Sequence, residues 1–211
     1  MPTVYDISPP ITADLAVFPG DTPPSREILL DMHRGDHLTL STLHATVHLG
    51  AHADGVNHYA ADGPAIDELK LHHYLGPCRV IDVSAARGER IALGDVPDGS
   101  PFDQPRILFF TGSQPDKNTF NQDFKGLEPD LIEALAGAGV MTVGVDTPSV
   151  DTATTKELIA HARCRKARIA IIEGLVLDAV PPGVYELIAL PLKLVGFDAS
   201  PVRAVLRELP A

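Results

Sequence analysis

Four potential metal ligands lie within eleven residues of this chain: His48, His52, Asp54 and His58. In a straight strand all four side chains share one face, but His48 and His52 are then roughly 13 Å apart at about 3.3 Å per residue. In a helix His48 stacks over His52, while Asp54 and His58 turn to another face. The segment 46–58 must therefore bend if these side chains meet. Glycine permits such a bend, so we predict an irregular loop closed around a cation with the help of Gly50 and Gly55.

This ligand set favours a catalytic metal site. Imidazole and carboxylate suit borderline divalent cations such as Zn²⁺, and a set without thiolates is more typical of catalytic than of structural zinc. The alternative is that the histidines are scattered surface or core side chains, as is usual for an isolated His-x-x-x-His pair. Their clustering beside an aspartate favours the metal site, and hence an enzyme. His44 continues the four-residue spacing without a nearby carboxylate, so we expect it to be solvated or hydrogen-bonded.

Composition limits the class of protein. With 211 residues, 45% of them hydrophobic, the chain can bury one core, and we expect a single domain over residues 1–211. The net charge of −11 argues against binding to nucleic acid or anionic membranes. Two cysteines give no disulfide framework and indicate a reducing compartment. Because we find no signal sequence and no apolar stretch of bilayer length, we expect a cytoplasmic protein.

The order of elements predicts a mixed α/β fold. Turn formers divide the first forty residues into extended pieces. Strands are expected at residues 38–47, 79–84, 106–111, 140–146, 169–180 and 184–192. One helix is expected from Pro129 to about Gly137, and another from a capping-box pattern at Thr154 to about Arg165. The polar, irregular segment 113–125 is expected to be an exposed loop.

Two further residues are candidates for the same site. Glu173 lies within an apolar run, where a buried carboxylate needs a cation or a hydrogen-bond network; the alternative is an edge strand that shows Glu173 to water. His161 lies on the inward side of the second helix, where a lone histidine is usually a satisfied core residue. A helix followed by a strand can still bring the two together as ligands of a second cation. Asp146 ends a strand and is expected either to support the site or to cap a turn.

The motif resembles that of a known family, the bacterial metal-dependent kynurenine formamidases, or arylformamidases, within the cyclase-like hydrolases. Their pattern, His-x-Gly-Thr/Ala-His-x-Asp-x-Pro-x-His, is matched by six positions: His48, Gly50, Ala51, His52, Asp54 and His58. Further segments resemble the family in the same order along the chain, at residues 18–23, 76–81, 143–149, 189–193 and 198–206.

The resemblance implies a compact α/β domain of the swivelling β/β/α type, assembled as a homodimer with the site near the subunit boundary. It implies two zinc ions, one bound by His48, His52 and Asp54, and a second bound by His161 and Glu173 and bridged by Asp54. His58 is then the acid/base, and Phe18 contacts the substrate. The implied small-molecule reaction is hydrolysis of N-formyl-L-kynurenine to L-kynurenine and formate, in tryptophan degradation.

Two positions depart from the family pattern. Val56 stands where the motif has proline, which removes a fixed φ before His58. Phe18 stands where these formamidases commonly carry tryptophan, which keeps an aromatic wall but removes the indole N–H.

The nearest alternative function is hydrolysis of a cyclic amide such as isatin with the same cations, and a second is a non-catalytic metal-binding or scaffold protein. A serine hydrolase lacks support, because the chain has no Gly-x-Ser-x-Gly motif.

Overall fold

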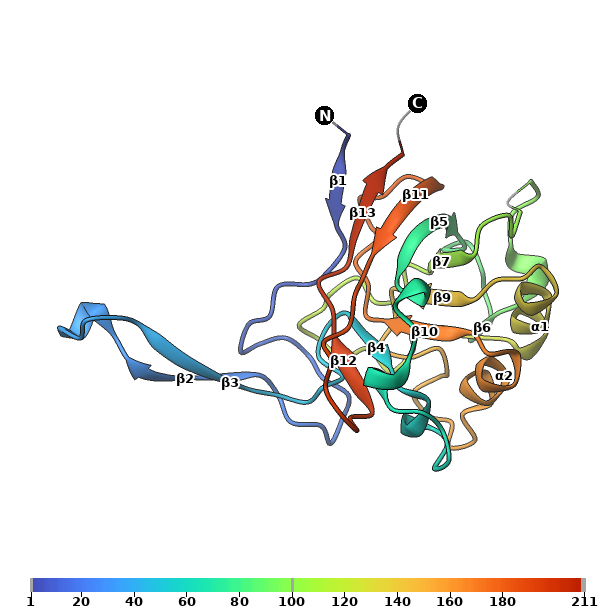
Figure 1. Ribbon diagram of the computed structural model, residues 1–211. Helices are drawn as coiled ribbons and strands as arrows, with labels where there is room; N and C mark the ends of the chain where they lie inside the picture. The colour runs from blue at the N-terminus through green and yellow to red at the C-terminus, as the bar shows by residue number, and fades with distance from the viewer. Residues whose placement is uncertain (1, 100, 210–211) are drawn as a thin grey trace.

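A nine-stranded mixed sheet organises the chain, which a computed structural model describes over residues 2–99 and 101–209 (Figure 1). In spatial order the strands are β1 (Val4–Asp6), β13 (Val205–Glu208), β11 (Gly183–Ile188), β5 (Leu75–Asp82), β7 (Arg106–Phe110), β9 (Thr142–Val145), β10 (Ala170–Glu173), β4 (His52–Asp54) and β12 (Ala199–Pro201). The central strands β5, β7, β9 and β10 run parallel, and the flanking pairs are antiparallel. The predicted mixed α/β class is therefore confirmed.

Smaller elements surround this sheet. The strands β2 (Ser25–Leu30) and β3 (Leu40–His44) form a separate hairpin, and β6 (Arg90–Ile91) pairs with β8 (Gly126–Leu127). Two helices, α1 (Pro129–Gly137) and α2 (Ile159–Ala167), lie beside each other next to the parallel strands (Figure 1). Five short 3-10 helices complete the described elements: η1 (Met32–Arg34), η2 (Val56–His58), η3 (Ile66–Glu68), η4 (Leu71–His73) and η5 (Leu93–Asp95).

The parallel strands were the most predictable part of the fold. Strands buried on both faces read as continuous apolar runs, and the predictions at 106–111 and 140–146 match β7 and β9 within a few residues. The prediction at 184–192 matches β11, which pairs antiparallel with both of its neighbours. The strand predicted at 79–84 begins earlier, at Leu75. The prediction of one strand over 169–180 is wrong beyond Glu173, because Gly174 turns the chain with φ of +68°.

The start of the second helix was predicted wrongly. Helix α2 begins at Ile159 and not at Thr154, and Leu158 just before it has a left-handed φ of +43°. In its first turn, the backbone N–H groups of Ala160 and His161 donate to the Asp151 carboxylate at 3.1 Å. A carboxylate outside the predicted capping box therefore caps the helix, since it satisfies donors that have no partner within the helix.

The core lies on both faces of the sheet. On one face α1 and α2 pack through Leu131, Leu135, Ala160 and Cys164 against the parallel strands. The other face buries Tyr74, Cys78, Leu187 and Leu206. Both cysteines, Cys78 and Cys164, are buried and free. None of the helices formed by the described residues has the length and hydrophobicity needed to cross a lipid bilayer.

The segment 113–125 is irregular, as predicted, but the prediction that it is exposed holds only in part, because two of its side chains are buried. Gln114 and Phe124 are buried, and the Gln114 side chain donates to the carbonyls of Asp116 and Thr119 at 2.9 and 2.7 Å. Because these hydrogen bonds lie within the loop, the polar segment forms a compact loop packed by its own side chains.

The bend in the histidine segment is held by a close backbone contact. Gly50 has φ of +58°, and a Cβ on Gly174 would lie 2.1 Å from the Gly50 carbonyl oxygen. The loop before β4 and the turn after β10 therefore pack backbone against backbone. Only glycine at position 174 allows this approach.

We expect Gly174→Ala to lower the free energy of unfolding by about 2–4 kcal/mol, because it combines a positive φ with a backbone clash. Gly137→Ala is the matched control. That glycine ends α1 and faces open space, so alanine there is expected to raise stability by up to about 1 kcal/mol. Urea denaturation followed by circular dichroism measures both, and similar midpoints for the two variants would contradict this account of the contact.

Candidate metal centre

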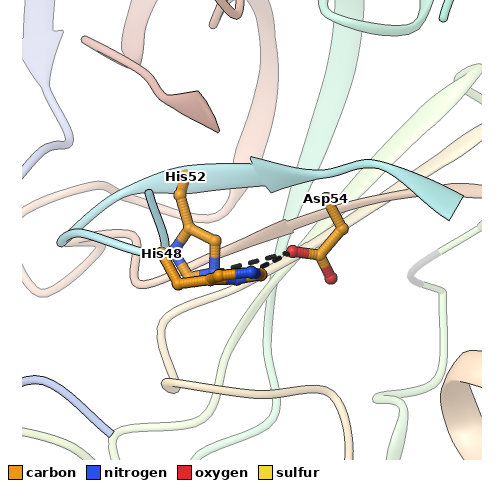
Figure 2. Close-up of side chains that lie close together, drawn as sticks. All are labelled: His48, His52 and Asp54. Atoms are coloured by element: carbon orange, nitrogen blue, oxygen red, sulfur yellow. Dashed lines mark ion pairs between the residues drawn. The ribbon is translucent and has the colours of Figure 1, made fainter. Parts of the chain in front are cut away.

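Strand β4 places two of the predicted ligands. His52 and Asp54 are two residues apart in the strand, so their side chains leave the same face of the sheet. The bend at Gly50 brings His48 close to both of them. Figure 2 shows the three side chains together, and Asp54 Oδ1 lies 3.4 Å from His48 Nδ1 and 3.7 Å from His52 Nε2. The prediction of an irregular loop is thus correct before Ala51 and wrong for residues 52–54, which pair with β10 and β12.

The second predicted glycine acts differently from the first. Gly55 has an extended φ of −77°, so it is not needed for a left-handed turn. A Cβ there would lie 2.5 Å from Asn57 Oδ1 and 2.8 Å from the backbone nitrogen of Ile66. Gly55 is therefore required for close packing, and the backbone N–H of His58 donates to its carbonyl at 3.1 Å. This turn forms although Val56 replaces the proline of the motif.

Glu173 reaches the cluster from the neighbouring strand. It ends β10 directly opposite His52 in the antiparallel pair, and its Oε2 lies 3.4 Å from His52 Nε2. The edge-strand alternative is wrong, because β10 lies between β9 and β4 and Glu173 is only 3% exposed. Its other oxygen, Oε1, accepts a hydrogen bond from the backbone of Val150 at 2.7 Å.

His161 reaches the cluster from α2. Its Nε2 lies 3.5 Å from Asp54 Oδ2 and 3.6 Å from Glu173 Oε1. Its Nδ1 is 2.8 Å from Asp151 Oδ2, a carboxylate that also pairs with Arg90 at 2.9 Å. Sequence reasoning missed Asp151, and the only local signal for it is a carboxylate some eight residues before a helix.

Each imidazole of the cluster is oriented through its second nitrogen. His52 Nδ1 lies 2.9 Å from the carbonyl oxygen of Gly50. Since a carbonyl oxygen can only accept a hydrogen bond, Nδ1 is the donor. His161 Nδ1 faces Asp151, and His48 Nε2 faces Asp198 at 3.1 Å. Such outer contacts fix which nitrogen faces a metal ion. The sequence alone predicts no role for Asp198 in the site, and its contact with His48 follows from the fold.

The buried atoms of the cluster fit a cation. Within the part of the chain that the structure describes, four of them have no hydrogen-bond partner: His52 Nε2, Asp54 Oδ1, Asp54 Oδ2 and His161 Nε2. Buried polar atoms are rarely left this way. Ligands of a tetrahedral zinc ion with bonds of about 2.0–2.2 Å lie about 3.2–3.6 Å from one another. The distances of 3.4–3.7 Å between these groups are close to that range.

The five predicted ligands fall into two sets that share Asp54. One Asp54 oxygen faces His48 and His52, and the other faces His161. Glu173 approaches a histidine of each set, His161 at 3.6 Å and His52 at 3.4 Å. The structure therefore brings His161 of α2 and Glu173 of β10 to the cluster, as the binding of two ions requires.

Electrostatics also favour positive charge here. Burial opposes ionisation of Asp54, but His161 and His48 outweigh it and lower the pKa of the carboxyl. Burial likewise lowers the pKa of His48, but Asp54 and Asp198 outweigh it and raise that pKa to about 9. For His161, Asp151 and Asp54 outweigh burial and raise the pKa to about 10. The carboxylates thus stabilise cationic charge at the imidazoles, whether it comes from protons or from a metal ion.

His58 lies at the border between the cluster and solvent. It ends η2, its side chain is 34% exposed, and its ring centroid is 4.2 Å from that of His48. Its Nδ1 is 3.7 Å from Asp198 Oδ2. Burial lowers the pKa of His58, so its imidazole is neutral at neutral pH. This position is suited to a proton carrier.

A cavity of about 560 Å³ opens over the cluster. Phe18 lies in its wall, where the sequence placed a substrate contact, and packs edge to face on Phe120 at 5.0 Å. Lys117 also lines it and donates to the carbonyl of Asp146 at 2.6 Å. The Asp146 carboxylate accepts from Thr111 at 2.7 Å, so this residue ties two strand ends together beneath the wall.

Comparison with known proteins identifies the family of this chain. Residues 5–152 match the model of the Cyclase family, described as "Putative cyclase". A solved potential metal-dependent hydrolase with cyclase activity is 28% identical, with a TM-score of 0.85 over 100% of both chains. A predicted metal-dependent hydrolase from Bacillus stearothermophilus is 29% identical, with a TM-score of 0.83 over 99% of this chain and 100% of that one.

Isatin hydrolase A from Labrenzia aggregata shares the fold, with a TM-score of 0.84 at 20% identity over 99% of this chain and 94% of that one. At this identity the likeness concerns the fold alone. The family model covers far more than half of the sequence, and the fold agrees over the whole described chain. This protein therefore belongs to the Cyclase family, and it is similar to solved structures described as a potential and a predicted metal-dependent hydrolase.

Proposed function

We propose that this protein is a metal-dependent hydrolase that cleaves N-formyl-L-kynurenine to L-kynurenine and formate. The observation that carries the hydrolase proposal is the set of buried, unpartnered ligand atoms on His52, Asp54 and His161, of which the two histidines line an open cavity. The donor set contains imidazole and carboxylate only, which supports Zn²⁺.

His48, His52 and Asp54 would hold one ion, and Asp54, His161 and Glu173 a second. When bound, such ions supply Lewis-acid polarisation of an amide carbonyl and make water acidic near neutral pH. Glu173 and Asp54 provide negative charge that balances the ions. Asp151 and Asp198 hold the imidazoles of His161 and His48 in position through the second ring nitrogen.

His58 would move the proton that amide cleavage requires. With Nδ1 toward Asp198, its Nε2 is the atom that takes a proton from water as water adds to the formyl carbon. The same nitrogen then returns the proton to the aniline nitrogen as the C–N bond breaks. Asp198 stabilises the imidazolium formed between these steps.

The cavity wall supports an aromatic substrate that carries an acid group. Phe18 and Phe120 offer ring faces and edges to an aryl group. Lys117 is partly buried in the wall, and an ammonium has three donors, of which Asp146 uses one. The amino-acid carboxylate of N-formylkynurenine is a suitable partner for this charge.

The alternative reaction is ring-opening hydrolysis of a cyclic amide such as isatin. It breaks the same type of bond with the same cations, and the structural likeness to isatin hydrolases supports it about as well. Isatin is neutral, so the charge of Lys117 is the feature that favours the formamide.

We expect the purified protein to release formate from N-formyl-L-kynurenine, and a chelator such as dipicolinate to abolish this activity. Added Zn²⁺ should restore it. Isatin serves as the parallel substrate. Turnover of isatin alone would replace the formamide proposal, and bound, exchangeable metal without turnover of either substrate would favour a non-catalytic metal-binding protein.

We expect His52→Ala to lose bound metal and activity together, because it removes a ligand, whereas His58→Ala should keep its metal and lose about 10²–10⁴-fold in kcat. His72→Ala is the matched control, since that histidine is exposed and outside the cavity. Metal analysis of the three purified variants measures this. Equal metal loss in His52→Ala and His58→Ala would show that His58 is a ligand.

We expect Lys117→Met to raise KM for N-formyl-L-kynurenine about 10–100-fold, since a charge-assisted contact is worth about 1.5–3 kcal/mol. KM for formanilide, which lacks the carboxylate, should change little. Lys166→Met, on the exposed side of α2, is the matched control and should leave both values unchanged. A similar rise for both substrates would mean that Lys117 shapes the wall without binding the carboxylate.

A further inference from the structure

A second cavity, of about 330 Å³, lies beside the metal centre and shares no lining residue with the cavity over the cluster. We call it the α2 pocket, because Cys164 and Arg165 of α2 and Arg168 just after that helix form part of its wall. Its volume is at the lower end of the range for ligand sites in proteins, about 300–1,000 Å³. The pocket therefore suits a small molecule, and the proposed amide hydrolysis makes no use of it.

The walls of the α2 pocket are largely apolar. They include the aromatic ring of Tyr59 and five aliphatic or proline side chains: Val56, Pro64, Leu69, Ile169 and Ala170. An apolar lining with one aromatic side chain suits the ring of an aromatic ligand. The phenol of Tyr59 also offers an O–H donor.

The charged groups of the α2 pocket leave one positive charge unbalanced. Arg165 is paired with Asp62 at 2.6 Å, and Asp54 directs its oxygens to the histidines of the metal centre. Arg168 forms no ion pair with any residue that the structure describes. A guanidinium of this kind can bind a carboxylate through two parallel hydrogen bonds. The pocket therefore favours a ligand with one carboxylate.

The backbone at Arg168 adopts a conformation for which glycine is the usual residue. Arg168 caps the C-terminus of α2 with a left-handed φ of +58°. Glycine is common at such helix ends, because any side chain there adds a steric cost. An arginine that bears this cost, with its side chain on the wall of a cavity, indicates that the side chain has a role.

A further positive charge is buried next to the α2 pocket. Arg106 is only 4% exposed, and its guanidinium donates to the backbone carbonyls of His73 and Pro77 at 2.9 and 3.1 Å. Its hydrogen-bond partners among the described residues include no carboxylate, so its charge is not neutralised. Because His73 lines the pocket, this charge lies behind one of the walls and favours an anion there.

We propose that the α2 pocket binds a small aromatic monocarboxylate, with the carboxylate on Arg168 and the ring against Tyr59 and the apolar wall. Such a ligand would reach the metal centre without entering the cavity over the cluster. Asp54 lines the pocket, and the Tyr59 ring packs against that of His161 with 5.0 Å between the centroids. The site does not depend on which amide the protein cleaves.

The location of a bound aromatic acid tests this directly. Crystals of the metal-loaded protein grown with 4-bromobenzoate would show the bromine by its anomalous scattering. We expect a bromine peak in the α2 pocket and the carboxylate on Arg168. A peak in the cavity over the cluster alone would overturn the proposal.

The affinity for benzoate in solution tests the role of Arg168. Equilibrium dialysis of the metal-loaded protein measures it, with acetohydroxamate present to occupy the metal ions. We expect Arg168→Gly to raise the dissociation constant about 10–100-fold, since it removes a charge-assisted contact. Arg168→Lys keeps the charge and should stay within about 10-fold of the wild type. Arg163→Met is the matched control, because this arginine of α2 pairs with Glu133 and lies outside the pocket, and it should bind like the wild type.

Arg168→Gly also separates binding from folding. Glycine relieves the left-handed backbone, so this variant should unfold at a higher urea concentration than the wild type while it binds benzoate more weakly. Unchanged benzoate binding in Arg168→Gly would overturn the proposal. Acetate, which lacks the ring, should bind at least about 10-fold more weakly than benzoate. Equal affinities would show that the pocket takes any small anion and would overturn its assignment to aromatic acids.

Discussion

The whole site depends on how the charge of Asp54 is compensated. The carboxylate is 2% exposed, and neither oxygen has a hydrogen-bond partner within the described chain. A buried, unpaired carboxylate costs several kcal/mol, so its surroundings must supply positive charge. Three imidazoles lie 3.4–3.7 Å from its oxygens without forming a hydrogen bond to them, close enough to share a cation. This requirement links the bend before β4, the end of β10 and the first turn of α2.

The supporting contacts leave little freedom for these imidazoles. Every ring has one nitrogen on an oxygen acceptor and the other toward the cluster. Gly50 is two residues from His52, whereas Asp151 is 10 residues from His161 and Asp198 is 150 residues from His48. Asp151 in addition caps α2, so the residue that orients His161 also fixes the start of its helix. The hydrogen bonds of Asp151 therefore both orient the His161 imidazole and stabilise the start of α2.

The floor and the walls of the cavity have different physical origins. The floor is built on β4 and β10, inside the sheet, where backbone pairing limits movement. The walls come from irregular segments that carry Phe18, Lys117 and Phe120. The candidate metal ligands thus lie largely on paired strands, while the cavity walls come from loops, which is a common division in enzymes.

By itself the sequence determined the local features: the metal-ligand motif, the bend at Gly50, helix α1 and the buried parallel strands, because each follows from residue type and short spacing. Only the tertiary structure decided that Glu173 lies in the interior, since strand order is a long-range property that an apolar run does not encode. It also decided where α2 begins, that Lys117 faces the cavity, and that Asp151 and Asp198 hold the histidines. Those contacts join residues 10 to 150 positions apart, so they depend on how the sheet is ordered and not on any local pattern.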